Sequence, residues 1–239
     1  MIAKMRLRLF GAILASLTLR SVCGGVAPES APQSANTSPE LVLGTIRVNA
    51  AERTVVFPAR VSLREGAVEY GIVTPLGALH ESLLVTDVNP VELHAAVLLL
   101  GVKPPVAKAI PTGPVRLDAD YLRAHPALTG HPVRLWVRWK SGEQDKRVPL
   151  EDWLVYSDGK PVGAGPWVYT GSFMQEGGRF AALGEGSVLC LVTNPAALLN
   201  NPRPGHGDDH VWEVRGASVP PVGTPVEVEI RIEKRPEVK

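Results

Sequence analysis

Cysteine is scarce in this chain, because Cys23 and Cys190 are the only two among 239 residues. Loss or lipidation of Cys23 would leave Cys190 without a disulfide partner. Cys190 lies in the apolar segment SVLCLV, and a free cysteine in such a segment behaves as a small buried hydrophobe. A reactive thiol needs partial exposure and a nearby cation, so we predict no catalysis by Cys190.

A surplus of positive charge is also missing once the N-terminus is set aside. The formal net charge is +1, but the first 24 residues hold four basic and no acidic side chains. The remaining 21 Lys and Arg against 24 Asp and Glu give a balance of −3. Proteins that bind nucleic acid need a positive field to hold the phosphates, so we expect no nucleic-acid partner.

Familiar catalytic motifs are absent as well. The sequence holds no G-x-S-x-G nucleophile turn and no glycine-rich phosphate loop. Ser82 follows His80 and Glu81 directly, but catalytic triads are defined by spatial geometry and rarely by neighbours in sequence. The sequence therefore favours a protein that is not an enzyme, and we predict no cofactor.

Apart from the N-terminus, no segment approaches the length of apolar run that spans a membrane. Residues 9–19, LFGAILASLTL, form a shorter run that follows three basic residues, a layout typical of a secretory signal. We therefore predict a signal peptide over residues 1–24. The protein is expected in the periplasm or anchored in the cell envelope, with membrane contact only through this signal or a lipid anchor.

Cys23 lies just after the apolar run, where bacterial lipoproteins carry their acylated cysteine. Arg20 departs from the lipoprotein pattern, whereas Gly24 and the following Ser-, Pro- and Ala-rich residues favour lipidation. Such a composition has too little apolar surface to fold, so we predict a flexible linker over residues 25–40. Lipidation of Cys23, simple cleavage and an uncleaved anchor remain open, and export follows from each.

The remainder of the chain predicts a single domain over residues 41–234. The whole chain contains 22 prolines and 23 glycines, which favour short strands and many turns. Strands are predicted at residues 41–48, 54–57, 60–63, 68–74, 79–86, 133–140, 146–148, 165–169, 180–183, 187–193, 211–214 and 226–232. A short helix is predicted from Asn194, and a long loop at 102–130. The fold class is α+β, with mainly antiparallel β-structure and one or two short helices packed on the sheet.

One helix is strongly specified by its ends. Asn89 is a favourable N-cap, Pro90 suits the first helical position, and Gly101 is a natural stop. The segment between them is mostly apolar, and Leu98 and Leu99 widen the face that we expect to be buried.

Three segments occur together in a characteristic order: GALHESLLVTDVNPVELHAAVLLLG at 77–101, GPWVYTGSF at 165–173 and GEGSVLCLVTNPAALLNNP at 184–202. They resemble the YdjY-type exported bacterial proteins, an uncharacterised family, over roughly residues 40–232. The resemblance implies one domain and a location in the cell envelope. It implies no activity.

Four polar residues stand among apolar ones in the first of these segments: His80, Glu81, Asp87 and His94. In a strand–helix unit the two imidazoles could approach each other, and a carboxylate beside them could complete a site for zinc or another divalent metal. Their spacing matches no established metal motif. The alternative, which we favour, is that His80 caps a turn and His94 is a hydrogen-bonded buried side chain.

A second candidate metal site is the glycine loop GHGDDH at 205–210, which contains His206, Asp208, Asp209 and His210. Flexible oxygen and imidazole ligands could gather a cation there. The same composition is typical of an exposed turn, and we favour the turn.

Trp136 is the candidate for an aromatic side chain that faces a ligand. It shares one face of the predicted strand with Arg134 and Arg138, whereas Trp139 shares the apolar face and is predicted to be core.

Together these features predict an exported envelope protein that binds a protein partner or a small ligand without catalysis. The rival hypothesis is a metal-binding or metal-dependent periplasmic protein that uses His80, Glu81 and His94. A third hypothesis is an assembly component with a hydrophobic docking patch.

Overall fold

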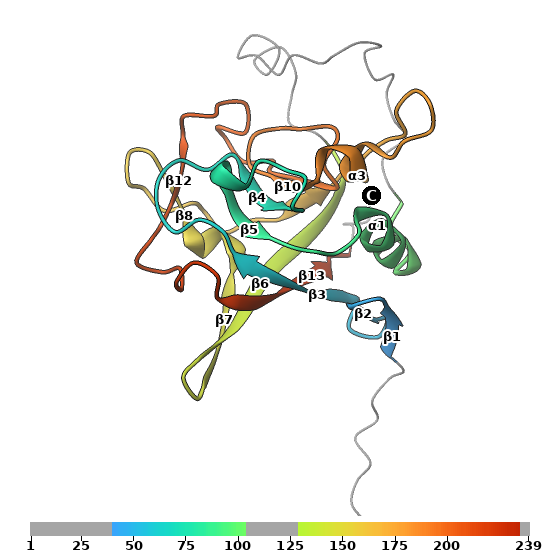
Figure 1. Cartoon of the computed structure of the whole chain (residues 1–239), viewed down its shortest axis with the longest axis horizontal. Helices are drawn as coiled ribbons and strands as arrows, with labels where there is room; N and C mark the ends of the chain where they lie inside the picture. Colours follow the sequence, from blue (N-terminus) through green and yellow to red (C-terminus); the bar gives the residue numbers. More distant parts are fainter. Residues whose placement is uncertain (1–39, 104–128, 235–239) are drawn as a thin grey trace, which may run out of the picture. The chain divides into compact units, whose positions relative to one another are not determined.

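A computed structural model describes residues 40–103 and 129–234. In this part of the chain, eight strands close into a barrel (Figure 1). In pairing order they are β3 (Thr54–Val61), β13 (Pro225–Ile232), β6 (His131–Ser141), β9 (Trp167–Tyr169), β11 (Leu199–Asn200), β10 (Ser187–Cys190), β4 (Tyr70–Val73) and β5 (Ser82–Val85), which returns to β3. The β4–β5 and β10–β11 pairs are parallel and the others antiparallel. The predicted β-rich α+β fold is confirmed.

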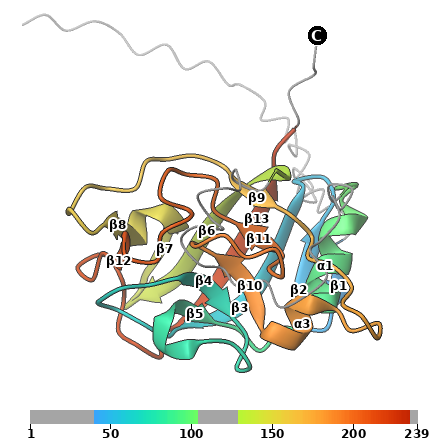
Figure 2. The same cartoon turned by 90° about the horizontal axis from the view of Figure 1, so that it is seen from above.

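Smaller elements surround the barrel. They are the strands β1 (Glu40–Leu43), β2 (Ile46–Asn49), β7 (Gln144–Pro149), β8 (Leu154–Tyr156) and β12 (Trp212–Val214), the helices α1 (Pro90–Leu99) and α3 (Ala181–Glu185), and the 3-10 turns η1 (Leu79–Glu81) and η2 (Leu150–Trp153). β1 and β2 extend the sheet beyond β3, β7 pairs with β6, and β8 and β12 form a separate sheet. Figure 2 shows α1 beside β1 and β2, with α3 close to its side.

The strand β6 explains how the sequence pattern builds the core. Val133, Leu135 and Val137 are at most 1% exposed, whereas the residues that alternate with them are only partly buried. A strand directs successive side chains to opposite faces, so one face of β6 lines the core and the other faces outward. β3 alternates in the same way from Phe57 to Val61, and β13 does so except at residues 228–230, which are all buried.

The predicted ends of helix α1 are confirmed, but one part of its predicted burial is wrong. The Val91 backbone N–H donates to Asn89 Oδ1 over 2.9 Å, and Gly101 follows the helix with φ at +77°, a left-handed value that glycine adopts without strain. Leu98 and Leu99 do not widen the buried face, because they are 37% and 59% exposed.

Several local predictions differ from the structure. Residues 79–81, predicted as the start of a strand, form the 3-10 turn η1. The strand predicted at 41–48 is a hairpin, because Gly44 turns the chain with φ at +59°. The strand predicted at 180–183 is mostly α3. No helix begins at Asn194, because the Asn200 side chain bonds to both its N–H and its C=O, which folds this segment back so that β11 pairs with β9.

Several sequence predictions fall outside the described residues. These include the signal peptide, Cys23, nearly all of the linker, and most of the loop at 102–130. Among the helices of residues 40–103 and 129–234, none has the length and apolar character needed to cross a membrane.

Candidate functional site

The first predicted metal group is divided among three places. His80 Nε2 lies 3.2 Å from Glu81 Oε1 in the exposed turn η1. Asp87 Oδ2 forms an ion pair with Arg60 over 3.1 Å. His94, on α1, has a partner of its own. Across the described residues, no three His, Cys, Asp or Glu side chains are gathered closely enough to hold a metal ion.

His94 lies where α1 meets the barrel. Its Nδ1 is 2.6 Å from the hydroxyl of Tyr169, and its ring lies 5.2 Å from that of Phe180, measured between centroids. Burial lowers the pKa of His94 below 6.5, because desolvation disfavours the charged imidazolium. The neutral His94 ring can accept a hydrogen bond from the Tyr169 hydroxyl at Nδ1, which agrees with the favoured interpretation of a hydrogen-bonded histidine.

The second predicted metal group lies on a turn. Asp208 Oδ1 accepts the backbone N–H of His210 over 2.9 Å, and His210 Nε2 is 3.5 Å from Asp209. The His206 ring is hydrogen-bonded elsewhere, to the Thr193 hydroxyl, with 2.7 Å between Nδ1 and Oγ1. Local bonds of this kind stabilise turns.

Glu69 links the two predicted groups. Burial is the main cause that raises its pKa above 4.5, and the negative charges of Glu81 and Asp209 raise it further, while His210 and His80 lower it. Its backbone N–H donates to the carbonyl of Glu81 over 3.0 Å. We call Glu69, His80, Glu81, Asp209 and His210 the Glu69 surface. Sequence reasoning missed this convergence, because the two predicted groups are more than 100 residues apart.

Helix α1 has an uncovered apolar side. Val91, Leu98 and Leu99 are 43%, 37% and 59% exposed, and Ala95 between them is also exposed. Positions three and four residues apart lie on one side of a helix, so these four residues form a continuous strip, which we call the α1 stripe. The opposite side of the helix is buried through Leu93, Ala96, Val97 and Leu100.

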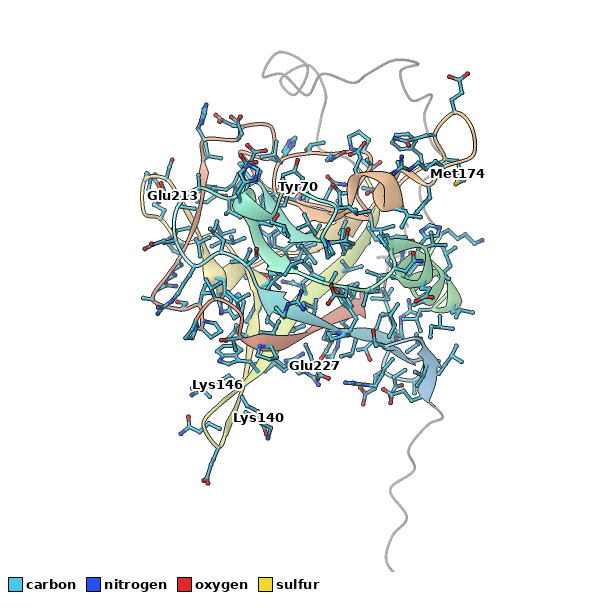
Figure 3. All side chains as sticks on the ribbon, viewed as in Figure 1. Tyr70, Lys140, Lys146, Met174, Glu213 and Glu227 are labelled. Carbon is cyan, nitrogen blue, oxygen red and sulfur yellow. The ribbon has the colours of Figure 1, made fainter. Side chains whose placement is uncertain are left out.

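Further apolar side chains lie around the α1 stripe. Leu41, in β1, is 47% exposed and lies opposite the buried Val48 of β2. β2 is the strand that α1 contacts. Paired residues share a sheet face, so Leu41 lies on the helix side. Met174 is 60% exposed and forms an isolated β-bridge with Phe180, whose ring packs against that of His94. Figure 3 shows Met174 on the loop beside α3.

Trp136 lies on the outward face of β6, as predicted, but a cation covers its ring. The Arg147 guanidinium is 3.7 Å from the ring centroid. Beside it, the buried carboxylate of Glu229 bonds to three arginines: Arg138, Arg147 at 3.1 Å and Arg231 at 3.2 Å. We call these five residues the Glu229 face. Figure 3 labels Lys140 and Lys146 farther along β6 and β7.

A buried ion pair also escaped sequence analysis. Glu151 and Arg203 are 2% and 8% exposed, with 3.5 Å between carboxylate and guanidinium. Glu151 also accepts the Trp167 indole N–H, while Arg203 donates to the carbonyls of Gly163 and Gly165. The network joins two segments that are about 50 residues apart in sequence. Because each of its polar groups has a partner, we interpret it as a structural network that stabilises the fold.

Cys190 is completely buried, and burial raises the pKa of its thiol. Burial disfavours the thiolate, which is the reactive form, and the prediction that Cys190 is a small buried side chain is confirmed.

A family model described as the YdjY domain matches residues 46–231, from β2 to β13. No curated protein and no solved structure matches the chain. Because the family model covers well over half of its length, the chain belongs to the YdjY domain family, whose function is unknown.

Proposed function

We propose that this member of the YdjY domain family is an exported cell-envelope protein that acts as a non-enzymatic interaction module, with the α1 stripe as its contact surface. The observation that carries the proposal is the uncovered apolar side of α1. A helix that is apolar on all sides is ordinarily buried on all sides. Within residues 40–103 and 129–234, β2, α3 and the core cover one side of α1 only, so the other side is available to a partner.

The energetics of exposure support this function. Burial of an exposed Leu or Val side chain contributes about 1.5–3 kcal/mol when it is complete, so three half-exposed side chains leave a substantial favourable term unused. Contiguous apolar patches on soluble proteins mark interaction sites more often than isolated exposed residues do. The barrel supports α1 rigidly through Leu93 and Val97, which are at most 1% exposed. A contact on the stripe would therefore require little rearrangement of the helix.

The sequence of the N-terminus supports the location. A basic segment, an apolar run at residues 9–19 and a cysteine at position 23 precede the domain, and this layout directs export. The module would therefore meet its partner in the periplasm or at the envelope membrane.

Cysteine labelling in intact cells tests the location and the contact together. Leu99→Cys and the matched control Val222→Cys both replace exposed apolar residues, and Cys190 is buried and unreactive. The reagent is a maleimide that cannot cross the cytoplasmic membrane, and the unsubstituted chain gives the background from Cys23. We expect Val222→Cys to be labelled in cells and after purification, and Leu99→Cys only after purification.

Each part of the proposal has its own contrary result. If Val222→Cys is not labelled until cells are lysed, the protein is not exported. If Leu99→Cys is labelled in cells as readily as Val222→Cys, no partner covers the α1 stripe and the interaction function is wrong.

Metal binding is the second candidate, and the Glu69 surface is the observation that favours it. The charges of Glu81, Asp209, His80 and His210 all act on the pKa of Glu69, and carboxylates and imidazoles are ligands that divalent metals accept. Binding would require the exposed side chains of His80 and His210 to turn toward Glu69, since no ligand group is assembled in the described residues. This version of the site omits His94, which is held by Tyr169.

Metal analysis of protein purified without added ions tests this candidate. A resident site should retain close to one equivalent, and Glu69→Gln should remove it. Less than about a tenth of an equivalent in the unsubstituted chain would eliminate the metal hypothesis, because a closed structural or catalytic site keeps its ion through purification.

A further inference from the structure

We propose that the N-terminus stays attached to the lipid bilayer, through lipidation of Cys23 or as an uncleaved signal, and that the partner of the α1 stripe is the surface of this bilayer. This inference rests on the proposed export and contact function and names the partner of that same surface. It adds a second membrane contact to the one predicted from the signal or lipid anchor.

The position of the stripe relative to the start of the domain is the first argument. Glu40 begins β1, which pairs with β2, and β2 contacts α1. Figures 1 and 2 both show β1, β2 and α1 side by side. The end of the domain that leads to the proposed anchor therefore adjoins α1, and Leu41, next to Glu40, is exposed.

The length of the preceding chain is the second argument. Sixteen residues, 24–39, separate Cys23 from Glu40, and a chain of that length reaches at most about 58 Å even when fully extended. A domain held within this distance of a bilayer has a high effective concentration at its surface. A small apolar contact is then sufficient, because the anchor already opposes the loss of translational freedom.

The chemistry of the stripe is the third argument. Its four members are aliphatic, with exposed charges only at the two ends of the helix in the described residues, Glu92 at the first turn and Lys103 after the last. Contact sites for proteins are enriched in Trp, Tyr and Arg, and the stripe has none. Aliphatic side chains on one side of a helix are the groups that insert into the boundary between headgroups and acyl chains.

The size of the stripe favours lipid over a second copy of the chain. Four partly exposed aliphatic side chains amount to on the order of 300 Å², the scale of a large apolar patch on an ordinary monomer. A stable protein complex buries about 800 Å² per partner. A bilayer has no such requirement, since each inserted side chain contributes independently and the anchor supplies the proximity.

Fluorescence quenching by lipids tests the proposal on the full chain. The chain is reconstituted through its N-terminus into vesicles of phosphatidylethanolamine and phosphatidylglycerol, some of which carry a nitroxide close to the headgroup. A fluorophore is attached at Leu99→Cys or at the matched control Val222→Cys, and the unsubstituted chain supplies the background from Cys23. We expect quenching at position 99 to exceed that at 222 at least about twofold, because only the stripe enters the boundary region.

A second variant separates lipid insertion from simple proximity. Leu98→Glu places a charge next to the label at position 99. Because position 98 lies on the exposed side of α1, the fold should be retained. The change should abolish the excess quenching at 99 without altering the signal at 222.

The contrary results are distinct from those of the labelling test in cells. Equal quenching at 99 and 222 would overturn the lipid proposal, and if position 99 is nevertheless protected in cells, the interaction function stands with a protein as partner. An emission shift at 99 that depends on protein concentration and not on lipid would identify a second copy as the partner and would also overturn the lipid proposal.

Discussion

Two surfaces of this protein differ in the chemistry of their side chains. On the Glu229 face, one carboxylate contacts three guanidinium groups and Arg147 also lies over the ring of Trp136, although Trp136 Nε1 and Arg138 Nε are buried without a hydrogen-bond partner among the described residues. The α1 stripe consists of aliphatic side chains that have water on one side. Polar groups that hydrogen-bond with one another lose little free energy when they also contact water. Apolar surface that stays in water is unfavourable in free energy. The comparison indicates that the α1 stripe is the surface that requires a partner.

The largest expected effect concerns the buried side of α1. Leu93→Ala removes a side chain that is 1% exposed, and we expect the free energy of unfolding to fall by about 2–5 kcal/mol, because a core cavity remains. Urea unfolding of the purified protein gives the value. A loss no larger than that of Leu99→Ala would mean that the two sides of the helix are equally covered, and the comparison would be unfounded.

A smaller loss is expected on the Glu229 face. Glu229→Ala removes the shared acceptor of three arginines that are 34–47% exposed. Loss of one partner from a buried pair costs about 3–5 kcal/mol, but solvent screens these guanidinium groups, so we expect about 2–3 kcal/mol. The matched control is Glu227→Ala, whose carboxylate is 42% exposed and should change stability by at most about 1 kcal/mol. Equal effects would show that the face is not held together by Glu229.

A change on the α1 stripe should leave stability almost unaltered and remove the contact. Leu99→Gln should shift the free energy of unfolding by no more than about 0.5 kcal/mol, because position 99 is 59% exposed. In cells, the maleimide should label a cysteine at position 98 in the Leu99→Gln variant more readily than the same cysteine in a chain that keeps Leu99. If Leu99→Gln destabilises the purified protein as Leu93→Ala does, the stripe is internal core and not a contact surface.

The smallest expected effect is a pH dependence at the border of the stripe. The folded-state pKa of His94 lies below 6.5, so the unfolded chain binds its proton first as the pH falls. This contribution to stability is complete above pH 6.5 and declines below it. Comparison of the unsubstituted chain with His94→Gln by urea unfolding above and below pH 6.5 isolates the effect. A stability difference between the two proteins that does not vary with pH would show that His94 titrates alike in both states.

Local signals in the sequence were sufficient for some elements. The caps at Asn89 and Gly101 and the alternation at 132–140 predicted α1 and β6, because caps and side-chain period depend on neighbours in sequence. The short helix α3 was missed, since five residues without a side-chain cap leave little local signal. The hairpin at Gly44 was missed because its apolar flanks read as one strand.

The candidate surfaces needed contacts between distant residues. The predicted metal groups were chosen from residues that are close in sequence, yet the structure gives His94 and His80 separate partners and places Glu81 and Asp209 where both raise the pKa of Glu69. The burial of Glu229 could not be read from VEVEIRI, where alternation marks it as an outward residue. Two of the arginines that pair with its carboxylate come from β6 and β7 and reach it only after the strands have paired.

By itself the sequence determined the β-rich class, the position and apolar nature of α1 and the membership of the YdjY family, because composition, period and caps act over a few residues. Tertiary structure alone decided that the barrel closes between β3 and β5, that Glu69 links two separate loops, and that Leu98 and Leu99 face water. The physical reason is that an apolar helix has no preferred side of its own. Only packing against the barrel selects which residues are buried and which remain for a partner.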